Sequence, residues 1–199
     1  MTFFVCARGC RWQTRLFALQ CLQGLVTAVD EGVSLSLRDS ATDAGQGSRT
    51  KNAAAETAAF PRAHLDLALA RAAPGGEGAY LVGRLNALVA TAYLAVSSMN
   101  LVLRVQGAAL LEAVVRALAQ SRDPDAADED DERAGAAPSL LDQCQAQIAS
   151  ILRLAFDPAN RAPALTICAC NVCFELVGCG VHLCASVCEY LRVFVFMHA

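Results

Sequence analysis

The amino-acid sequence predicts an all-α protein made of stacked helical pairs. Hydrophobic residues make up 55% of its 199 residues and aromatic residues only 6%. Alanine and leucine, which lose little side-chain entropy in a helix, are abundant. The stretch 80–120 predicts two helices joined by a short polar corner at 97–100. Because no long alternation of apolar and polar residues interrupts the chain, we expect no sheet.

The second helix of that stretch shows why stacking is expected. One side of the helix carries, at every fourth position, Arg104, Ala108, Glu112, Arg116 and Gln120. The apolar residues cover more than a single stripe, which is typical of a helix with neighbours on two sides. A pair of such helices cannot bury its apolar surface alone and needs similar pairs against it. The residues that we expect to form this core are Leu85, Leu88, Val105, Leu111, Val115 and Leu118.

Two further helices are predicted before the central pair. The first spans Trp12–Asp30 and is expected to end at Glu31-Gly32, because glycine can take the left-handed conformation after a last helical turn. A short helix then begins at Phe60-Pro61 and is stopped by Pro74-Gly75-Gly76.

The helices predicted after the central pair have clear end signals. Ser139 can cap a helix that runs from Leu140 to Phe156 and closes before Pro158, since a residue before proline is pushed out of helical geometry. Pro163 suits the first turn of the next helix, which is expected to end near Val177. A last apolar segment follows.

These elements predict an α-solenoid fragment of about six antiparallel helices, because helical pairs recur at roughly the period of HEAT and armadillo units, about 40 to 47 residues each. Two inserts without apolar anchors, about 38–58 and 122–138, are expected to be disordered. The expected organisation is a poorly specified N-terminus at 1–11, helical repeats over 12–181, and a divergent apolar helix over 182–199.

Charge gives no reason to expect binding to nucleic acid, since the formal net charge is -3. Nor do we expect a membrane span. The segment 165–197 is apolar, but Glu175, Glu189 and Arg192 interrupt every window of about 20 residues that a span would need. Association with membranes is therefore expected only through partners.

Cysteines are numerous, with ten in the chain and six of them between Cys168 and Cys188. Cys170 and Cys173 have the CxxC spacing of zinc sites, and a second pair could come from downstream cysteines with His182 nearby. The surrounding sequence is helical and apolar, however, and lacks knuckle turns. We expect small buried thiols in a reducing compartment, with no metal or cofactor. A cysteine-rich metal-binding protein is the less favoured alternative.

No constellation predicts catalysis. The histidines, His64, His182 and His198, are scattered without a grouped nucleophile and base. The sequence contains no GxGxxG, Walker-type, HExxH or GxSxG pattern. We therefore expect a protein that is not an enzyme and has no catalytic residues.

Six short blocks of the chain resemble, in the same order, segments of the HEAT repeat-containing protein 5 family. Their colinearity from Trp12 to Val181 makes the resemblance more specific than any single block. The blocks are Trp12–Ala18, Ala63–Ala70, Leu103–Gly107, Leu140–Gln147, Leu152–Phe156 and Ala169–Cys173.

That family comprises very large cytosolic α-solenoids that associate with the clathrin-adaptor machinery of the trans-Golgi network and endosomes. The resemblance implies a non-enzymatic scaffold in vesicle-mediated transport, endocytic recycling and protein localisation. It also implies an internal fragment of a longer chain or a truncated gene model, cytoplasmic and peripheral at those membranes. The implied partners are clathrin-adaptor subunits and neighbouring HEAT repeats. The alternative is a generic HEAT/armadillo protein-binding module of an unrelated process.

Overall fold

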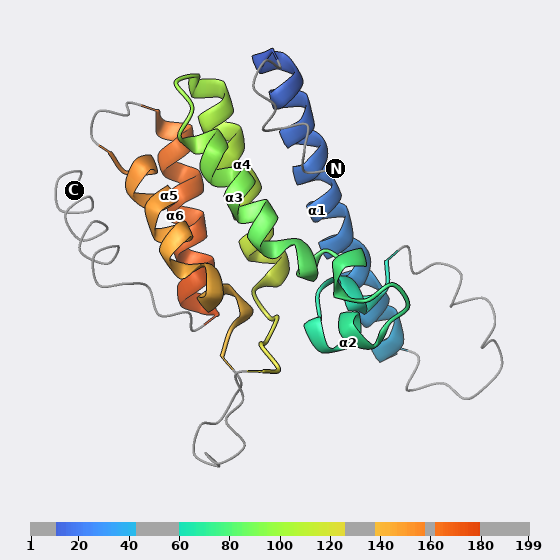
Figure 1. Ribbon diagram of the computed structural model, residues 1–199. Coiled ribbons are helices and arrows are strands. Elements are labelled where there is room, and N and C mark those ends of the chain that lie inside the picture. Colours follow the sequence, from blue (N-terminus) through green and yellow to red (C-terminus); the bar gives the residue numbers. More distant parts are fainter. Residues whose placement is uncertain (1–10, 43–59, 126–137, 158–161, 180–199) are drawn as a thin grey trace.

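The computed structural model describes residues 11–42, 60–125, 138–157 and 162–179, and these residues form six α-helices (Figure 1). Within those ranges no strand occurs, and the only β feature is an isolated bridge between Arg122 and Ser139. The all-α prediction is confirmed. The helices are α1 (Trp12–Thr42), α2 (Leu67–Ala72), α3 (Leu85–Val96), α4 (Leu101–Leu118), α5 (Gln145–Ala155) and α6 (Pro163–Gly178). Short 3-10 turns are η3 (Arg62–His64), η4 (Glu77–Ala79), η5 (Val82–Arg84) and η6 (Leu140–Cys144).

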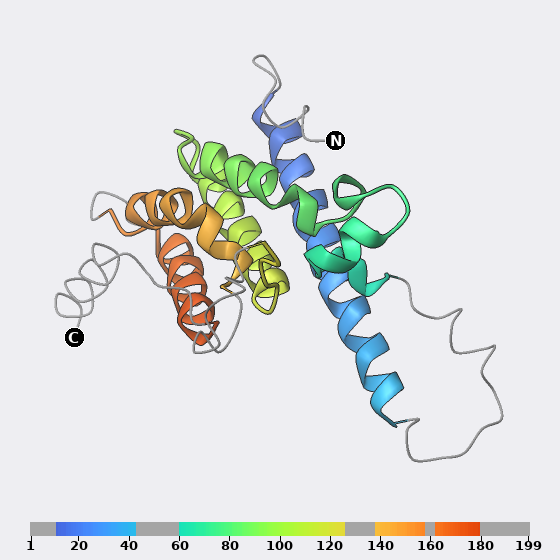
Figure 2. The same ribbon diagram turned by 60° about the horizontal axis from the view of Figure 1, so that its bottom comes forward.

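The helices stack in two layers around α4. Helix α4 packs against α1 on one side and α6 on the other, and these three helices form one layer. Helix α3 packs against both α4 and α5, so α3 and α5 form the second layer (Figures 1 and 2). This is the arrangement expected when a helix has apolar surface on more than one side.

The core follows the predicted residues of the central pair. Leu85, Leu88, Leu111, Val115 and Leu118 are buried, which confirms five of the six core residues in full. The sixth residue, the half-buried Val105, packs against the same core.

The corner between α3 and α4 is held by side-chain caps. Asn100 is the N-cap residue of α4, and its Oδ1 accepts hydrogen bonds from the backbone N–H groups of Val102 (2.9 Å) and Leu103 (3.4 Å). The Ser97 hydroxyl donates to the carbonyl of Tyr93 (2.8 Å). The Asn100 bonds satisfy N–H groups that the start of a helix leaves unpaired, so the predicted polar corner is confirmed.

The first helix is longer than predicted. Helix α1 continues through Gly32 to Thr42, so the end predicted at Glu31-Gly32 is wrong, and residues 38–42 are helical instead of belonging to an insert. Gly32 serves close packing: a Cβ atom at this position would lie 2.9 Å from Cδ2 of Phe60. The absence of a side chain at Gly32 leaves space for the ring of Phe60, which is 28 positions away in the sequence.

The insert predicted at 122–138 has structured ends. The backbone N–H of Asp123 donates to the carbonyl of Pro138, and the N–H of Leu140 donates to the carbonyl of Ser121, both at 3.0 Å. Asp123 is buried. Residues 122–125 and 138 are therefore ordered, contrary to expectation. The remainder of this insert, 126–137, lies outside the described residues, as do positions 43–58 of the first insert.

The remaining helix ends follow the sequence signals. The Ser139 hydroxyl accepts from the N–H of Leu141 (3.3 Å), and η6 leads directly into α5. Pro163 is the first residue of α6, as predicted. The short helix predicted after Phe60-Pro61 is split into η3 and α2, with the Asp66 carboxylate capping α2 by accepting from the N–H of Leu69 (3.1 Å).

None of the helices in the described ranges has the length and apolar character needed to cross a membrane. The segments 1–10 and 180–199 lie outside those ranges. The boundaries expected at residues 11 and 181 therefore stay predictions.

Candidate interaction surface

A row of polar side chains crosses the layer formed by α1, α4 and α6. It consists of Asp30 on α1, Glu112 and Arg116 on α4, and Asn171 and Glu175 on α6, and we call it the polar strip. Sequence analysis placed two of these residues, Glu112 and Arg116, on the polar side of α4. It did not bring together the other three, because they come from helices far apart in the chain.

Arg116 is the centre of the polar strip. Its Nη2 donates to Oε1 of Glu112 (2.8 Å), and its Nε donates to Oε1 of Glu175 (3.3 Å). The Glu112 carboxylate also accepts from Nδ2 of Asn171 (3.0 Å). The Arg116 side chain is 52% exposed and that of Glu112 only 16%, so the guanidinium faces water while one of its partners is largely covered. Half-exposed ion pairs of this kind contribute little to the free energy of folding. A binding partner could therefore replace them at little cost to the fold.

Asp30 lies at the edge of the polar strip, and its carboxylate is under-compensated. Burial raises the pKa of Asp30, Arg116 opposes the rise, and the negative charges of Glu31 and Glu175 add to it. The carboxylates that interact with the Arg116 guanidinium are therefore those of Asp30, Glu112 and Glu175. The surface has a local excess of negative charge that a basic partner group would neutralise.

We expect Asp30→Asn to stabilise the protein at neutral pH. The folded protein binds a proton at Asp30 more tightly than the unfolded chain, whose ordinary value is 3.8. The free energy of unfolding therefore falls as pH rises through this raised pKa, and the full penalty is present at pH 7. Asparagine removes the penalty, so the urea midpoint should rise at pH 7, and the difference from the parent should vanish towards pH 3.8.

Glu31→Gln is the matched control, because it removes the same charge from an exposed neighbouring position on α1. Its urea midpoint should change less than that of Asp30→Asn. Identical pH profiles for the parent and Asp30→Asn would show that Asp30 carries no such penalty.

The cysteines of the described residues are not arranged as a reactive or metal-binding group. Cys170 is exposed and Cys173 buried, although both lie on α6. No three His, Cys, Asp or Glu side chains within the described ranges are grouped to hold a metal ion. The downstream residues of the zinc hypothesis, His182, Cys184 and Cys188, lie outside those ranges. The hypothesis is therefore untested.

Burial favours the protonated form of the thiols of Cys168 and Cys170 on α6 and of Cys179 just after it. Burial raises the pKa of Cys168 to about 11, and the neighbouring Glu112 carboxylate adds to the effect through its charge and a hydrogen bond. Burial also raises the pKa values of Cys170 and Cys179. The thiolate is the form that acts as a nucleophile or a metal ligand. A raised pKa therefore lowers the reactivity of these cysteines at neutral pH.

His64 is a packing residue. Its ring lies edge-on to Phe60 and to Tyr80, with centroid distances of 5.7 and 5.2 Å. Its Nδ1 accepts from the backbone N–H of Leu81 (3.4 Å), and burial lowers its pKa, which favours the neutral ring. His182 and His198 lie outside the described residues.

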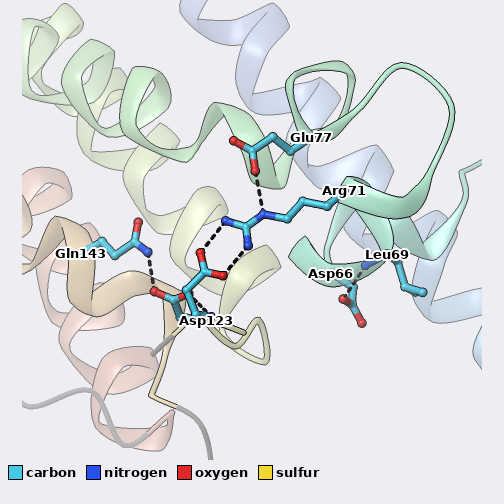
Figure 3. Close-up of polar contacts among 7 residues, drawn as sticks. Asp66, Leu69, Arg71, Glu77, Asp123 and Gln143 are labelled. Carbon is cyan, nitrogen blue, oxygen red and sulfur yellow. Dashed lines mark hydrogen bonds and ion pairs between the residues drawn. The ribbon is translucent and has the colours of Figure 1, made fainter. Parts of the chain in front are cut away.

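A second polar group, the Arg71 clamp, links the short helix α2 to the segment that follows α4 (Figure 3). Arg71 donates through Nη1 and Nη2 to the two carboxylate oxygens of Asp125, at 2.7 and 2.8 Å, and through Nε to Glu77 at 2.9 Å. Beside it, the buried Asp123 accepts from Nε2 of Gln143 on η6 (2.6 Å). The hydrogen bonds from Arg71 lower the pKa of Asp125. The clamp therefore links three stretches of the chain through exposed ion pairs, which contribute little stability.

Two outer helices display apolar stripes that the sequence analysis did not identify. On α6, Ile167, Phe174 and Val177 are 60%, 79% and 66% exposed. On α1, Phe17 and Leu25 are 67% and 47% exposed. Residues seven or eight apart lie on the same side of a helix, so each set forms one continuous stripe. These seven- and eight-residue spacings are present in the sequence, but only the fold shows that no described helix packs against these faces.

Helices that stack in two layers, each against its neighbours in the chain, form an α-solenoid of helical repeats. Comparison with protein families identifies the repeat: residues 80–197 match the Laa1/Sip1/HEATR5 HEAT repeat region. Because the match covers more than half of the 199 residues, the chain belongs to this family. The resemblance inferred from the sequence is thereby confirmed.

The family match has different limits from the six blocks of resemblance. It begins after Trp12–Ala18 and Ala63–Ala70 and continues beyond Val181 to residue 197. No curated protein and no solved structure matches the chain. Membership in a HEAT repeat region indicates a scaffold that works through contacts with other proteins.

Proposed function

We propose that this protein is a non-enzymatic scaffold in vesicle-mediated transport that binds clathrin-adaptor subunits, peripherally at the trans-Golgi network, endosomes and endocytic vesicles. The observation that carries the proposal is the polar strip, a single surface built by three helices of one solenoid layer. Solenoids use such extended surfaces to bind partners along several repeats at once. The family resemblance supplies the process.

The chemistry of the strip indicates what a partner would bring. Three carboxylates, of Asp30, Glu112 and Glu175, lie around the one guanidinium of Arg116, and that guanidinium is half exposed. A partner segment with lysine or arginine side chains would replace or share the Arg116 contacts. Complementary charge of this kind mainly sets partner choice and association rate.

The absence of catalytic function is also part of the proposal. HEAT repeat regions are typically scaffolds, and the raised pKa values of the Cys168 and Cys170 thiols agree with that interpretation. The polar strip has no pairing of a nucleophile with a base among its described residues. We therefore expect binding to be its whole activity.

The test is a binding assay with purified clathrin-adaptor complex over the immobilised chain. The parent should retain the adaptor, and Glu112→Gln/Glu175→Gln, which removes two charges without changing shape, should weaken retention by about tenfold. Glu77→Gln is the control, because it removes a charge from the Arg71 clamp and leaves the strip untouched.

Three outcomes would count against the proposal or part of it. A helical, folded parent that retains no adaptor would reject the transport role and favour a HEAT module of another process. Equal losses in the strip variant and Glu77→Gln would reject the strip as the binding surface. Phosphate release or another turnover by the purified chain would reject the non-enzymatic assignment.

A further inference from the structure

Residues 60–84 form a compact unit of short elements between α1 and α3, which we call the 60–84 unit (Figures 1 and 2). Its elements η3, α2, η4 and η5 pack on one another, and Phe60 attaches the start of the unit to α1 at Gly32. Helix α2 has only six residues, and the 3-10 turns have three each. Because helices this short are unstable alone, the unit stays closed only through contacts between its parts.

The His64 ring joins the two ends of this unit. It lies edge-on to Phe60, at the start, and to Tyr80, near the end. Its Nδ1 accepts a hydrogen bond from the backbone N–H of Leu81 (3.4 Å). Since a backbone N–H can only donate, Nδ1 must carry its lone pair, and the proton of the neutral ring is on Nε2. The contact that closes the unit therefore exists only for the neutral ring.

Protonation of His64 would replace this hydrogen bond with a conflict. Nδ1 would then carry a proton that points at the N–H of Leu81, so that two donors face each other. Leu81 is buried, and its N–H would lose its acceptor at a cost to the closed form. The positive charge would also be held in a half-buried place between two aromatic rings, where hydration is reduced.

The charged groups around His64 do not compensate for such a charge. The titratable and charged residues of the elements around the ring are Asp30 and Glu31 on α1, Arg62 and Asp66 beside His64, Arg71 on α2, Glu77 on η4, Tyr80, and Arg84 on η5. The pKa of His64 is lowered by burial, and none of these groups contributes to that shift. The ring therefore has no carboxylate partner that would hold it in the charged form.

We propose that His64 is a pH-sensitive pin. While its ring is neutral it holds the 60–84 unit closed against α1, and protonation of the ring opens the unit while α3 and α4 stay folded. Opening exposes the buried side chains of the unit, which are Ala63, Leu67, Ala70, Leu81 and Val82. The device goes beyond the adaptor role and does not depend on it.

The pH range of the opening follows from the direction of the shift. Because the folded unit binds a proton at His64 less tightly than the unfolded chain, with its ordinary pKa of 6.5, the pin is fully effective above pH 6.5. Its contribution is lost as pH falls through the lowered pKa of the folded protein. The contact of Arg71 with Asp125 persists in this range, since Arg71 lowers the pKa of Asp125 below its ordinary 3.8.

Amide hydrogen exchange of the full chain at about pH 7.5 and about pH 5.5, one unit on either side of 6.5, tests the pin. Each rate is divided into that of an unfolded peptide at the same pH, which gives a protection factor. Peptides of the 60–84 unit should lose about three- to tenfold in protection at the lower pH, tenfold being the limit for a ring that stays neutral whenever the unit is closed. Peptides of α3 and α4 should keep theirs.

Three variants separate the pin from other effects of pH. His64→Gln removes the titrating ring, so the protection of the 60–84 unit should become equal at the two pH values. His198→Gln is the matched control, because it removes a histidine elsewhere in the chain and should leave the parent's pH dependence intact. Arg71→Gln removes the cation of the Arg71 clamp, and it should lower protection by the same factor at both pH values.

Histidine ring resonances in NMR give a second measurement that does not depend on the stability of His64→Gln. The signal missing from that variant belongs to His64, and in the parent it should titrate below 6.5 with the neutral proton on Nε2. A His64 pKa at or above 6.5, or a neutral ring protonated on Nδ1, would overturn the proposal. So would equal protection of the 60–84 unit at both pH values, or an equal loss in α3 and α4, which would mean general unfolding.

Discussion

Replacing Leu111 with aspartate is expected to unfold the protein. Leu111 is 1% exposed and lies in α4, the helix that packs against α1, α3 and α6. Loss of a buried leucine side chain costs about 2 to 5 kcal/mol. A carboxylate left there without a partner adds several kcal/mol more. Together these terms are comparable with the whole stability of a small protein, about 5 to 15 kcal/mol.

Far-UV circular dichroism during heating measures this effect. Leu111→Asp should show little helical signal, or a melting temperature far below that of the parent. Met99→Asp is the control, because Met99 is 101% exposed and its replacement introduces the same carboxylate into water. If Leu111→Asp melts within a degree or two of the parent, Leu111 is not part of the core.

The central helical pair could be predicted because local signals and packing agree there. Asn100 is both a good N-cap residue and the actual cap of α4. Leu85, Leu88 and Leu111 fall on the apolar side of their helices and are buried. When capping, propensity and apolar spacing all favour one arrangement, a single sequence is sufficient.

The error at Gly32 shows where a local rule fails. Glycine is favoured after a helix end because it tolerates a left-handed backbone, and that rule predicted a stop. The helix instead continues, and the role of Gly32 is to leave space for the ring of Phe60. At Gly75 and Gly76 the same rule applies, because both have positive φ angles, 93° and 67°. The sequence alone does not distinguish a glycine kept for its backbone from one kept for its small size.

The polar strip could not be predicted from the sequence for a related reason. Asp30, Arg116 and Glu175 meet only because α1 and α6 pack on opposite sides of α4. The Arg71 clamp joins residues 54 positions apart, Arg71 and Asp125. Neither pairing has a local sequence signal. The polar side of α4 was visible from its spacing, but its partners come from the tertiary fold.

Gly107→Ala is expected to destabilise the protein even though alanine is the better helix former. At the crossing of α3 and α4, a Cβ atom on Gly107 would lie 2.6 Å from Cβ of Ala95, and 3.0 Å from the backbone oxygen of Ala92. Alanine gains about 1 kcal/mol over glycine in a helix interior. Overpacking of a close crossing costs about 1 to 3 kcal/mol, and here two of the nearest atoms belong to rigid backbone. The second effect should prevail, and urea unfolding measures the difference.

Gly24→Ala is the control that measures the helix-propensity effect without any overpacking. Gly24 lies in α1, and a Cβ atom there would meet nothing within 4 Å. This control should raise the free energy of unfolding by up to about 1 kcal/mol, while Gly107→Ala lowers it. Adding Ala95→Gly to Gly107→Ala removes the 2.6 Å contact, so the double variant should be less destabilised than the sum of the two single changes. Strict additivity, or a Gly107→Ala protein as stable as Gly24→Ala, would mean that α3 and α4 do not cross as closely as the structure places them.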